Sequence, residues 1–119
     1  MKIRVVTKKP NEKPEIVDFE DELNEYQRFV GGRIECYEVI SGVNFVINED
    51  GKFLRLMPNI VCPEFDDFFV GNILAAGVDF DAGCFLSLTD EQVQEVIDYF
   101  NKYHIEDGRK IVCRNTECR

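Results

Sequence analysis

Two segments of the chain carry hydrophobic residues at the spacing of one helical face. The clearer segment has an apolar stripe that consists of Val93, Val96, Ile97, Phe100 and Tyr103. In the other, acidic residues precede the stripe, two glycines follow it, and the stripe consists of Phe19, Leu23, Tyr26 and Val30. Because a glycine readily ends a helix, the pattern predicts two amphipathic helices, at Glu20–Val30 and Asp90–Tyr103.

A capping sequence marks the start of the second helix. Thr89 and Gln92 have the spacing of a capping box, in which each side chain bonds the backbone N–H of the other residue. Leu88 and Val93 flank this box at the spacing of a hydrophobic staple. The apolar residues 84–88 are therefore expected to form a short strand that runs directly into the helix.

Other apolar runs have the shorter period of β-strands. The segments with this pattern are residues 2–6, 33–40, 43–48 and 73–76. Residues 53–57 are expected to return from a turn at Asn48–Gly51 as the second strand of a hairpin, because Asp-Gly tolerates positive φ. Residues 15–19 fit either a strand or the lead-in to a helix, and residues 57–72 are expected to be a surface loop. The predicted class is α+β, a mainly antiparallel sheet with both helices packed on one face.

Charged residues are distributed unevenly along the chain. Residues 14–107 hold 21 acidic and 5 basic side chains, a net charge of −16, whereas the two ends together have a net charge of +7. Nucleic-acid binders usually carry basic patches, so direct nucleic-acid binding is not expected. An acidic body attracts basic surfaces of other proteins, although acidity also serves solubility alone. We expect one acidic domain, residues 1–107, and a basic, cysteine-containing appendage, residues 108–119.

The reactive side chains match no catalytic or metal-binding motif. His104 is the single histidine, and it is expected to cap the helix or to place a favourable charge at its end. Asp79 and Asp81 are too few to hold a hard cation well, and a solvated turn is the simpler interpretation. Cys113 and Cys118 do not have the usual spacing of zinc ligands. We expect no enzyme activity, no metal and no cofactor.

Cysteine usage and hydropathy point to a cytoplasmic protein. The cysteines number five and show no tight framework, so thiols are expected in place of disulfides. Buried free thiols account most simply for Cys36 and Cys84. No apolar run approaches the ~20 residues that cross a bilayer, and no membrane association is expected.

Three segments of the chain resemble a known family. They are VGGRIECYEV, NEDGKFLRLMPN and FVGNILAAGVDFDAGCFLSLTDEQ, in this order. Together they are similar to the domain of unknown function 3846 family, over residues 1–103. The resemblance implies an accessory protein of bacteriophages, plasmids or conjugative elements, and it implies no catalytic residues. The cysteine-bearing tail falls outside the shared segments.

These observations favour a non-enzymatic protein that binds and modulates another protein. The expected partner is a host protein with a basic surface, such as a nucleic-acid-binding nuclease of a defence system. A CRISPR effector is one example, and the acidic side chains would then mimic nucleic-acid charge in its groove. The candidate contact residues are Glu20, Asp21, Glu22, Glu25, Glu64, Asp66 and Asp67.

The alternative is a protein that binds or sequesters a small molecule, for example a signalling nucleotide. An anionic ligand needs local positive charge. The basic residues available within 14–107 are Arg28, Arg33, Lys52, Arg55 and Lys102. Their clustering around a pocket would favour this alternative, and their scattering would count against it.

Overall fold

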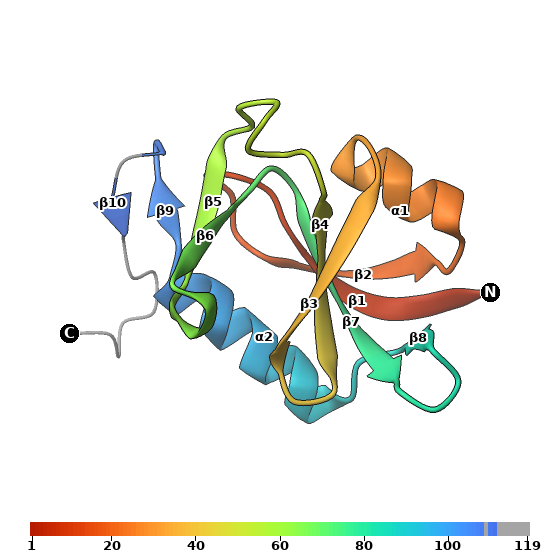
Figure 1. Cartoon of the computed structure of the whole chain (residues 1–119). Helices are drawn as coiled ribbons and strands as arrows, with labels where there is room; N and C mark the ends of the chain where they lie inside the picture. The colour runs from red at the N-terminus through yellow and green to blue at the C-terminus, as the bar shows by residue number, and fades with distance from the viewer. Residues whose placement is uncertain (109, 112–119) are drawn as a thin grey trace.

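The computed structural model describes residues 1–108 in full and residues 110 and 111 by their backbone. The described strand pairs are all antiparallel (Figure 1). The elements, in chain order, are β1 (Lys2–Lys8), β2 (Glu15–Glu20), α1 (Leu23–Val30), β3 (Ile34–Ile40), β4 (Val43–Asn48), β5 (Pro58–Cys62), the 3-10 helix η1 (Pro63–Phe65), β6 (Asp67–Val70), β7 (Ile73–Asp79), β8 (Cys84–Leu86), α2 (Asp90–Lys102), β9 (Ile105–Glu106) and β10 (Lys110–Ile111). The predicted combination of helices with a mainly antiparallel sheet is confirmed.

The main sheet has the strand order β2-β1-β7-β4-β3, with β8 added beside β7. β7 is its central strand. One edge of β7 pairs first with β1 and then with β8, while β4 runs along the other edge. Residues 84–88, expected as a strand before the second helix, contribute only the three residues of β8. The centre of the sheet is therefore the segment after Asn72, and not the segment before the second helix.

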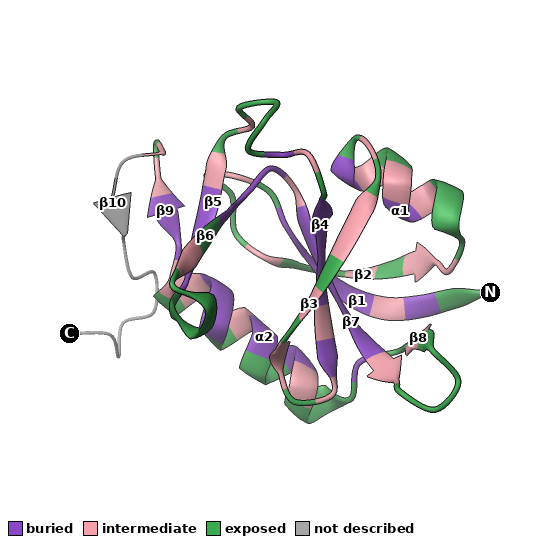
Figure 2. Cartoon of the chain, viewed as in Figure 1, coloured by how far each residue is buried: buried purple, intermediate pink, exposed green. Residues whose placement is uncertain are grey.

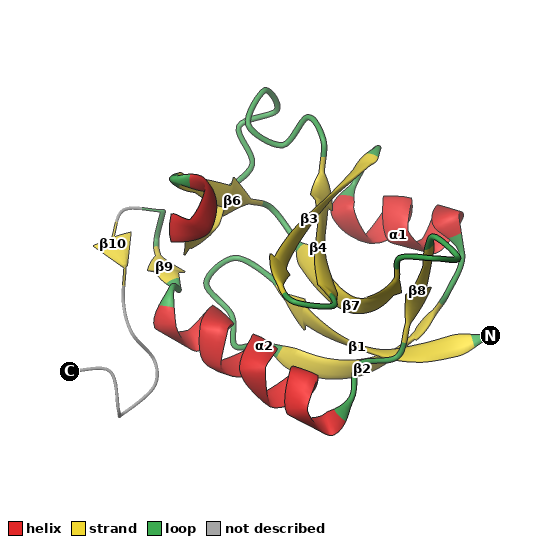
Figure 3. Ribbon diagram, turned by 60° about the horizontal axis from the view of Figure 1, so that its bottom comes forward, coloured by secondary structure: helices red, strands yellow, loops and turns green. Residues whose placement is uncertain are grey.

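The two helices pack on opposite faces of this sheet, so the prediction of a single helical face is wrong. Val5 of β1 belongs to the hydrophobic cluster that contains Tyr26 and Val30 of α1. Its neighbour Val6 belongs to the cluster that contains Phe100 of α2. Successive side chains of a strand point to opposite faces, and both faces of the central strands are buried (Figure 2). Figure 3 shows α2 below β1 and β2, with α1 across the sheet.

Residues 57–72, predicted as an irregular surface loop, instead form a second sheet. β5 and β6 pair as a hairpin around η1. Ile60, Cys62 and Phe69 of this hairpin are buried in the same cluster as α2. The small sheet therefore extends the core beyond the main sheet.

The chain after α2 runs alongside β5. The Val61 N–H donates to the Tyr103 carbonyl at 3.0 Å, and Ile60 forms a bridge with His104. β9 then pairs with β10, so residues 110 and 111 of the predicted appendage pair with the strand that follows α2. Cys113 and Cys118 lie outside the described residues.

The local signals at the helix ends are largely confirmed. Thr89 and Gln92 form the capping box, with bonds of 3.1 and 3.0 Å. α1 ends at Gly31, which adopts the left-handed conformation with a φ of 86°. It begins at Leu23, later than predicted, because residues 15–20 form β2 on the edge of the sheet.

The predicted strand at residues 53–57 is absent, and its place is taken by turns. Phe53 has 87% of its surface exposed, so the segment has no buried face to pair. Gly51 is required because its backbone lies close to Val70 and to the Asn48 carbonyl, and not because its φ is positive. A Cβ there would lie 2.8 Å from Val70 Cγ2 and 3.3 Å from the Asn48 carbonyl oxygen.

The basic first strand neutralises its acidic neighbour. In the β1–β2 register, Lys2 lies opposite Glu20 and Arg4 lies opposite Asp18, and opposite charges on facing residues favour strand pairing. Arg4 also forms an ion pair of 2.8 Å with Asp90, at the start of α2. Basic residues of the N-terminal segment thus neutralise acidic residues from other parts of the chain in the folded protein.

A buried polar contact joins the main sheet to the small sheet. Asn59 of β5 is fully buried, and its Nδ2 donates to the carbonyls of Lys8 and Gly71, both at 2.7 Å. Its Oδ1 accepts a 2.8 Å bond from Nζ of Lys8, itself fully buried. Burial of an ammonium is costly unless polar groups solvate it. Asn59 therefore both stabilises the Lys8 charge and links β1, β5 and the start of β7.

Replacing Asn59 with Ala should destabilise the protein by at least about 3 kcal/mol, because two buried carbonyls and the Lys8 ammonium each lose a bond. Asn24, exposed on α1, provides the control, and Asn24→Ala should change stability by less than about 0.5 kcal/mol. Urea unfolding followed by circular dichroism measures both. Equal unfolding midpoints for the two variants would contradict the role of Asn59.

Replacing Thr89 with Ala should cost about 1 kcal/mol, because the Gln92 N–H at the start of α2 loses its acceptor. Thr89→Ser retains the hydroxyl and should remain within a few tenths of a kcal/mol of the wild type. Thermal unfolding is the measurement, and Thr89→Ala is expected to lower Tm by about 4 °C. An unchanged Tm would show that the capping box contributes nothing to stability.

Candidate functional site

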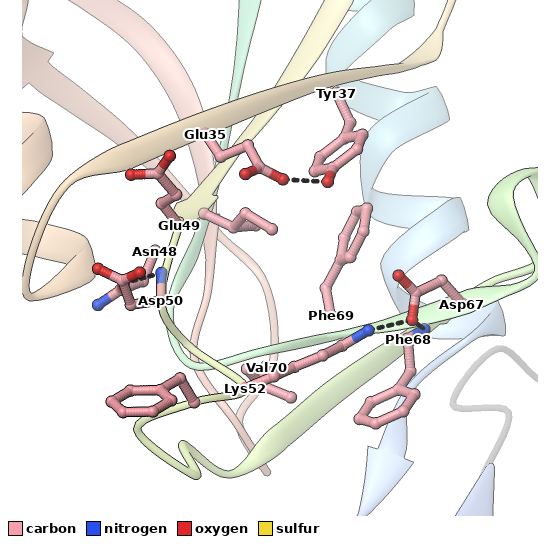
Figure 4. Close-up of a pocket in the computed structure, with 12 residues that line it drawn as sticks. Glu35, Tyr37, Asn48, Glu49, Asp50, Lys52, Asp67, Phe68, Phe69 and Val70 are labelled. Atoms are coloured by element: carbon pink, nitrogen blue, oxygen red, sulfur yellow. Dashed lines mark hydrogen bonds and ion pairs between the residues drawn. The ribbon is translucent and has the colours of Figure 1, made fainter.

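A pocket opens between β3, the turn after β4, and β6 (Figure 4). Its volume is about 160 Å³. Four carboxylates line it, those of Glu35, Glu49, Asp50 and Asp67, together with the ammonium of Lys52. Four aromatic rings complete the lining, those of Tyr37, Phe53, Phe68 and Phe69. We call this hollow the acidic pocket.

Asn48 holds the turn that supplies Glu49 and Asp50. Its Oδ1 accepts a 2.8 Å bond from the Asp50 N–H, and its Nδ2 donates to the Val30 carbonyl at the end of α1. The Glu49 N–H donates to the Arg33 carbonyl at 2.8 Å. The acidic turn is thus hydrogen-bonded to the end of α1 through Asn48 and to Arg33, the residue before β3, through Glu49.

Aromatic stacking joins β3 to the small sheet. The Tyr37 ring lies 5.2 Å from the rings of both Phe65 and Phe69. Phe53, Phe65 and Phe68 are more than 40% exposed, although phenylalanine is usually buried. Exposed aromatic rings that gather on one surface are typical of surfaces that bind other molecules.

Local partners set the protonation of two groups in the pocket. The Tyr37 hydroxyl donates to Glu35, and this bond raises the pKa of Tyr37 to about 12. Burial by itself raises the pKa of Asp67, but hydrogen bonds from Lys52 and the Phe68 N–H outweigh it, so the pKa lies below its usual value. At neutral pH the phenol therefore carries its proton and Asp67 carries its charge.

A second hollow lies between the end of β3, η1 and α2. We call it the tyrosine groove, and it is lined by Ile40, Glu64, Glu95, Asp98, Tyr99, Lys102 and Tyr103. The Tyr99 hydroxyl donates to Glu64 Oε1 at 2.5 Å and lies 3.4 Å from the buried Cys62 sulfur. Burial raises the pKa of Tyr99 and that of Cys62, so both keep their protons. Together the acidic pocket and the tyrosine groove make up what we call the acidic face.

The predicted contact residues separate into two groups. Glu64 and Asp67 line the acidic face, and the exposed Asp66 lies between them in sequence. The residues of the other group stand between β2 and α1, at the opposite end of the molecule (Figures 1 and 3); they are Glu20, Asp21, Glu22 and Glu25.

Internal partners occupy most of this second group. Glu20 pairs with the N-terminal amine at 2.5 Å, and Glu25 pairs with Arg28 at 3.0 Å. Asp21 accepts a bond of 2.7 Å from the Tyr26 hydroxyl. The structure therefore does not bring the seven predicted residues into one site.

The basic residues of the nucleotide-binding alternative are dispersed. Arg28 pairs with Glu25 on α1, and Arg33 pairs with Glu49 and Asp50 at 3.1 and 3.2 Å. Lys52 lies in the acidic pocket and Lys102 in the tyrosine groove, while Arg55 occupies a turn with a φ of 59°. This scattering among carboxylates counts against an anionic ligand.

The remaining reactive groups occupy structural positions. His104 is fully buried beside β5, with Nε2 at 3.4 Å from Glu106 Oε1, so it is not a surface cap of α2. Cys36 and Cys84 are exposed, which corrects the expectation that they are buried. Asp79 Oδ1 accepts bonds from the N–H groups of residues 81 and 82, as a turn requires.

The described residues form neither a metal-binding cluster nor a membrane-spanning helix. Residues 1–108, 110 and 111 contain no group of three or more His, Cys, Asp or Glu side chains that could hold a metal ion. None of the helices described is long and apolar enough to cross a membrane.

Comparison with protein families relates the chain to one of them. A family model with the description "Domain of unknown function (DUF3846)" matches residues 1–103. The chain belongs to the DUF3846 family. Neither the curated proteins nor the solved structures include a significant match.

The DUF3846 match spans every residue that lines the acidic face and stops immediately before His104. Sequence reasoning missed Glu35, Glu49, Asp50, Glu95 and Asp98, because they lie on elements that meet only in the fold. Besides the carboxylate cluster at residues 64–67, the aromatic residue at 53, next to a turn, is a signal that could have indicated this surface.

Replacing Glu35 with Gln should lower the pKa of Tyr37 from about 12 towards its usual value of 10. In the wild type, the bond that raises this pKa stabilises the folded state below pH 10. This contribution to the free energy of unfolding is lost as the pH rises from 10 to 12. The pKa is measurable from the ¹³Cζ shift of Tyr37 during a pH titration. Glu38→Gln on the same strand is the control and should leave this titration unchanged. An identical titration in Glu35→Gln would rule out the bond.

Proposed function

We propose that this DUF3846 protein binds a basic surface of another protein through its acidic face and thereby modulates that protein, without catalysing a reaction itself. The observation that carries the proposal is the composition of the two hollows. Seven carboxylates and two ammonium groups line them. Because nearby opposite charges steer and orient protein association, a cationic partner is favoured.

Exposed aromatic side chains supply the apolar part of this interface. Phe53 and Phe68 line the acidic pocket and Phe65 contacts its Tyr37 ring, with exposures of 87%, 41% and 45%, and aromatic anchors provide much of the binding energy at protein interfaces. Solubility accounts for the carboxylates but gives no reason for the exposed rings beside them. The combination supports binding in preference to simple solvation.

The partner class that best fits this chemistry is a nucleic-acid-binding protein, because such proteins carry basic grooves. The specific candidate is a host defence nuclease, such as a CRISPR effector, inhibited by a phage or mobile-element accessory protein in the cytoplasm. In this version the acidic face occupies the groove in place of a nucleic acid. Glu64, Asp66 and Asp67 would contact the partner, and the group from Glu20 to Glu25 would contribute little.

Neutralising the acidic face should weaken partner binding at least about tenfold, since several charge contacts of up to about 1 kcal/mol each are lost. The test variant is Glu64→Gln/Asp66→Asn/Asp67→Asn. The control removes three charges at the other end of the molecule, in Glu20→Gln/Glu22→Gln/Glu25→Gln. Each immobilised protein is incubated with the lysate of a bacterial host, and retained proteins are quantified by mass spectrometry.

The expected result is a set of basic proteins that the wild type and the control retain and the test variant loses. Duplex DNA and about 0.5 M salt should release the same set, because both compete for positive charge. Equal retention by all three proteins would contradict binding through the acidic face. Retention that DNA does not reverse would refute the nuclease version while leaving a basic protein partner in place.

A further inference from the structure

The acidic pocket already holds one ammonium group, which comes from the protein itself. Lys52 forms an ion pair with Asp67 and places its Nζ 4.6 Å from the centre of the Phe68 ring. Asp67 is held in position by a 2.7 Å bond from the Phe68 N–H. A carboxylate beside an aromatic face is a favourable environment for an organic cation. The Lys52 side chain therefore shows which chemical group this corner of the pocket accommodates.

Lys52 can leave this position without exposing a buried group. Its side chain is 51% exposed, and exposed ion pairs contribute little to stability. The neighbouring backbone belongs to the turn at residues 51–55 and not to a strand. The ammonium can thus move into solvent while Asp67 and Phe68 remain in place.

The pocket offers more negative charge than Lys52 neutralises. Arg33 pairs with Glu49 and Asp50 from outside the pocket. Within the described part of the chain, Glu35 bonds the neutral Tyr37 hydroxyl and forms no ion pair. A second cation would therefore find a carboxylate whose charge is not yet neutralised.

The size of the pocket selects a side chain over a larger ligand. A cavity of roughly 150 Å³ holds one benzene molecule, and pockets for drug-sized ligands measure about 300–1,000 Å³. At about 160 Å³, the acidic pocket fits the end of one long side chain and is too small for a nucleotide.

We infer that the acidic pocket receives the ammonium of a lysine side chain from the partner protein, and that Lys52 is an internal competitor that this lysine displaces. The inference rests on the proposed function, because it identifies the chemical group through which the acidic face would engage its partner. Lysine is favoured over arginine because the group already seated there is an ammonium, which a single carboxylate oxygen, Asp67 Oδ1, accepts together with the Phe68 N–H.

Internal competition has a measurable consequence. The apparent Kd equals the intrinsic Kd divided by the fraction of molecules whose site is open. If Lys52 occupies the corner most of the time, its removal should tighten binding of a lysine side chain by about three- to tenfold. Loss of the Asp67 charge or of the Phe68 ring should weaken the same binding by at least about fivefold.

The test titrates the full-length protein with the peptide Ac-Gly-Lys-Gly-NH₂ and follows amide shifts by NMR. Peptides with arginine or norleucine in place of lysine are the comparison probes. Lys52→Gln is the key variant, and Lys13→Gln, which removes one charge from an exposed loop lysine, is the control. Asp67→Asn and Phe68→Leu report on the two groups that hold the ammonium.

The expected shifts centre on β3, β6 and the turn at residues 49–53, with tighter binding in Lys52→Gln than in Lys13→Gln. Equal effects of these two variants, or equal binding of the arginine or norleucine peptide, would overturn the inference. The proposed function is tested separately by Glu64→Gln/Asp66→Asn, which leaves Asp67 intact. If that variant loses the host partner and the peptide shows no lysine preference, only the pocket assignment fails.

Discussion

The buried amide of Asn59 is the contact on which the arrangement of the two sheets depends. It bonds the backbone of β1, the backbone of Gly71 directly after β6, and the Lys8 ammonium at once. The small sheet carries one wall of the acidic pocket, including Asp67 and Phe68. The opposite wall is β3, at the far edge of the main sheet. The small sheet that forms this wall is therefore joined to the main sheet by a contact that lies outside the pocket, within the core.

The features that could be predicted from the sequence depend on neighbours within a few residues. The capping box at Thr89 and the glycine end of α1 are of this kind, and both are present. The faces of the sheet could not be predicted in this way. Val5 and Val6 of β1 are adjacent and both buried, and such a pair departs from strict alternation. A strand covered on both faces gives this pattern, but the residues of the strand do not indicate which helix covers which face.

The acidic face was only partly predictable for a related reason. Asp67 could be proposed because it lies in a visible cluster of carboxylates in the sequence. Glu35, Glu49 and Glu95 could not, because they reach the face from β3, the turn after β4, and α2. Counting charges along the chain also does not register that the strand facing Glu20 is basic. The charges of a sequence can be interpreted as a binding surface only after those that strand pairing neutralises have been set aside.

The pairing of β1 with β2 also explains how so acidic a chain avoids strong self-repulsion. Lys2 and Arg4 lie opposite Glu20 and Asp18, and the Lys8 ammonium is withdrawn into the core. Most of the first segment's positive charge is thus used inside the fold, where solvent and partners do not meet it. The acidic face at the other end of the molecule keeps its excess of carboxylates, and the cations within it, Lys52 and Lys102, lie near the rings of Phe68 and Tyr103. The fold therefore places the acidic pocket, which four carboxylates line, beside exposed aromatic side chains that a partner could cover.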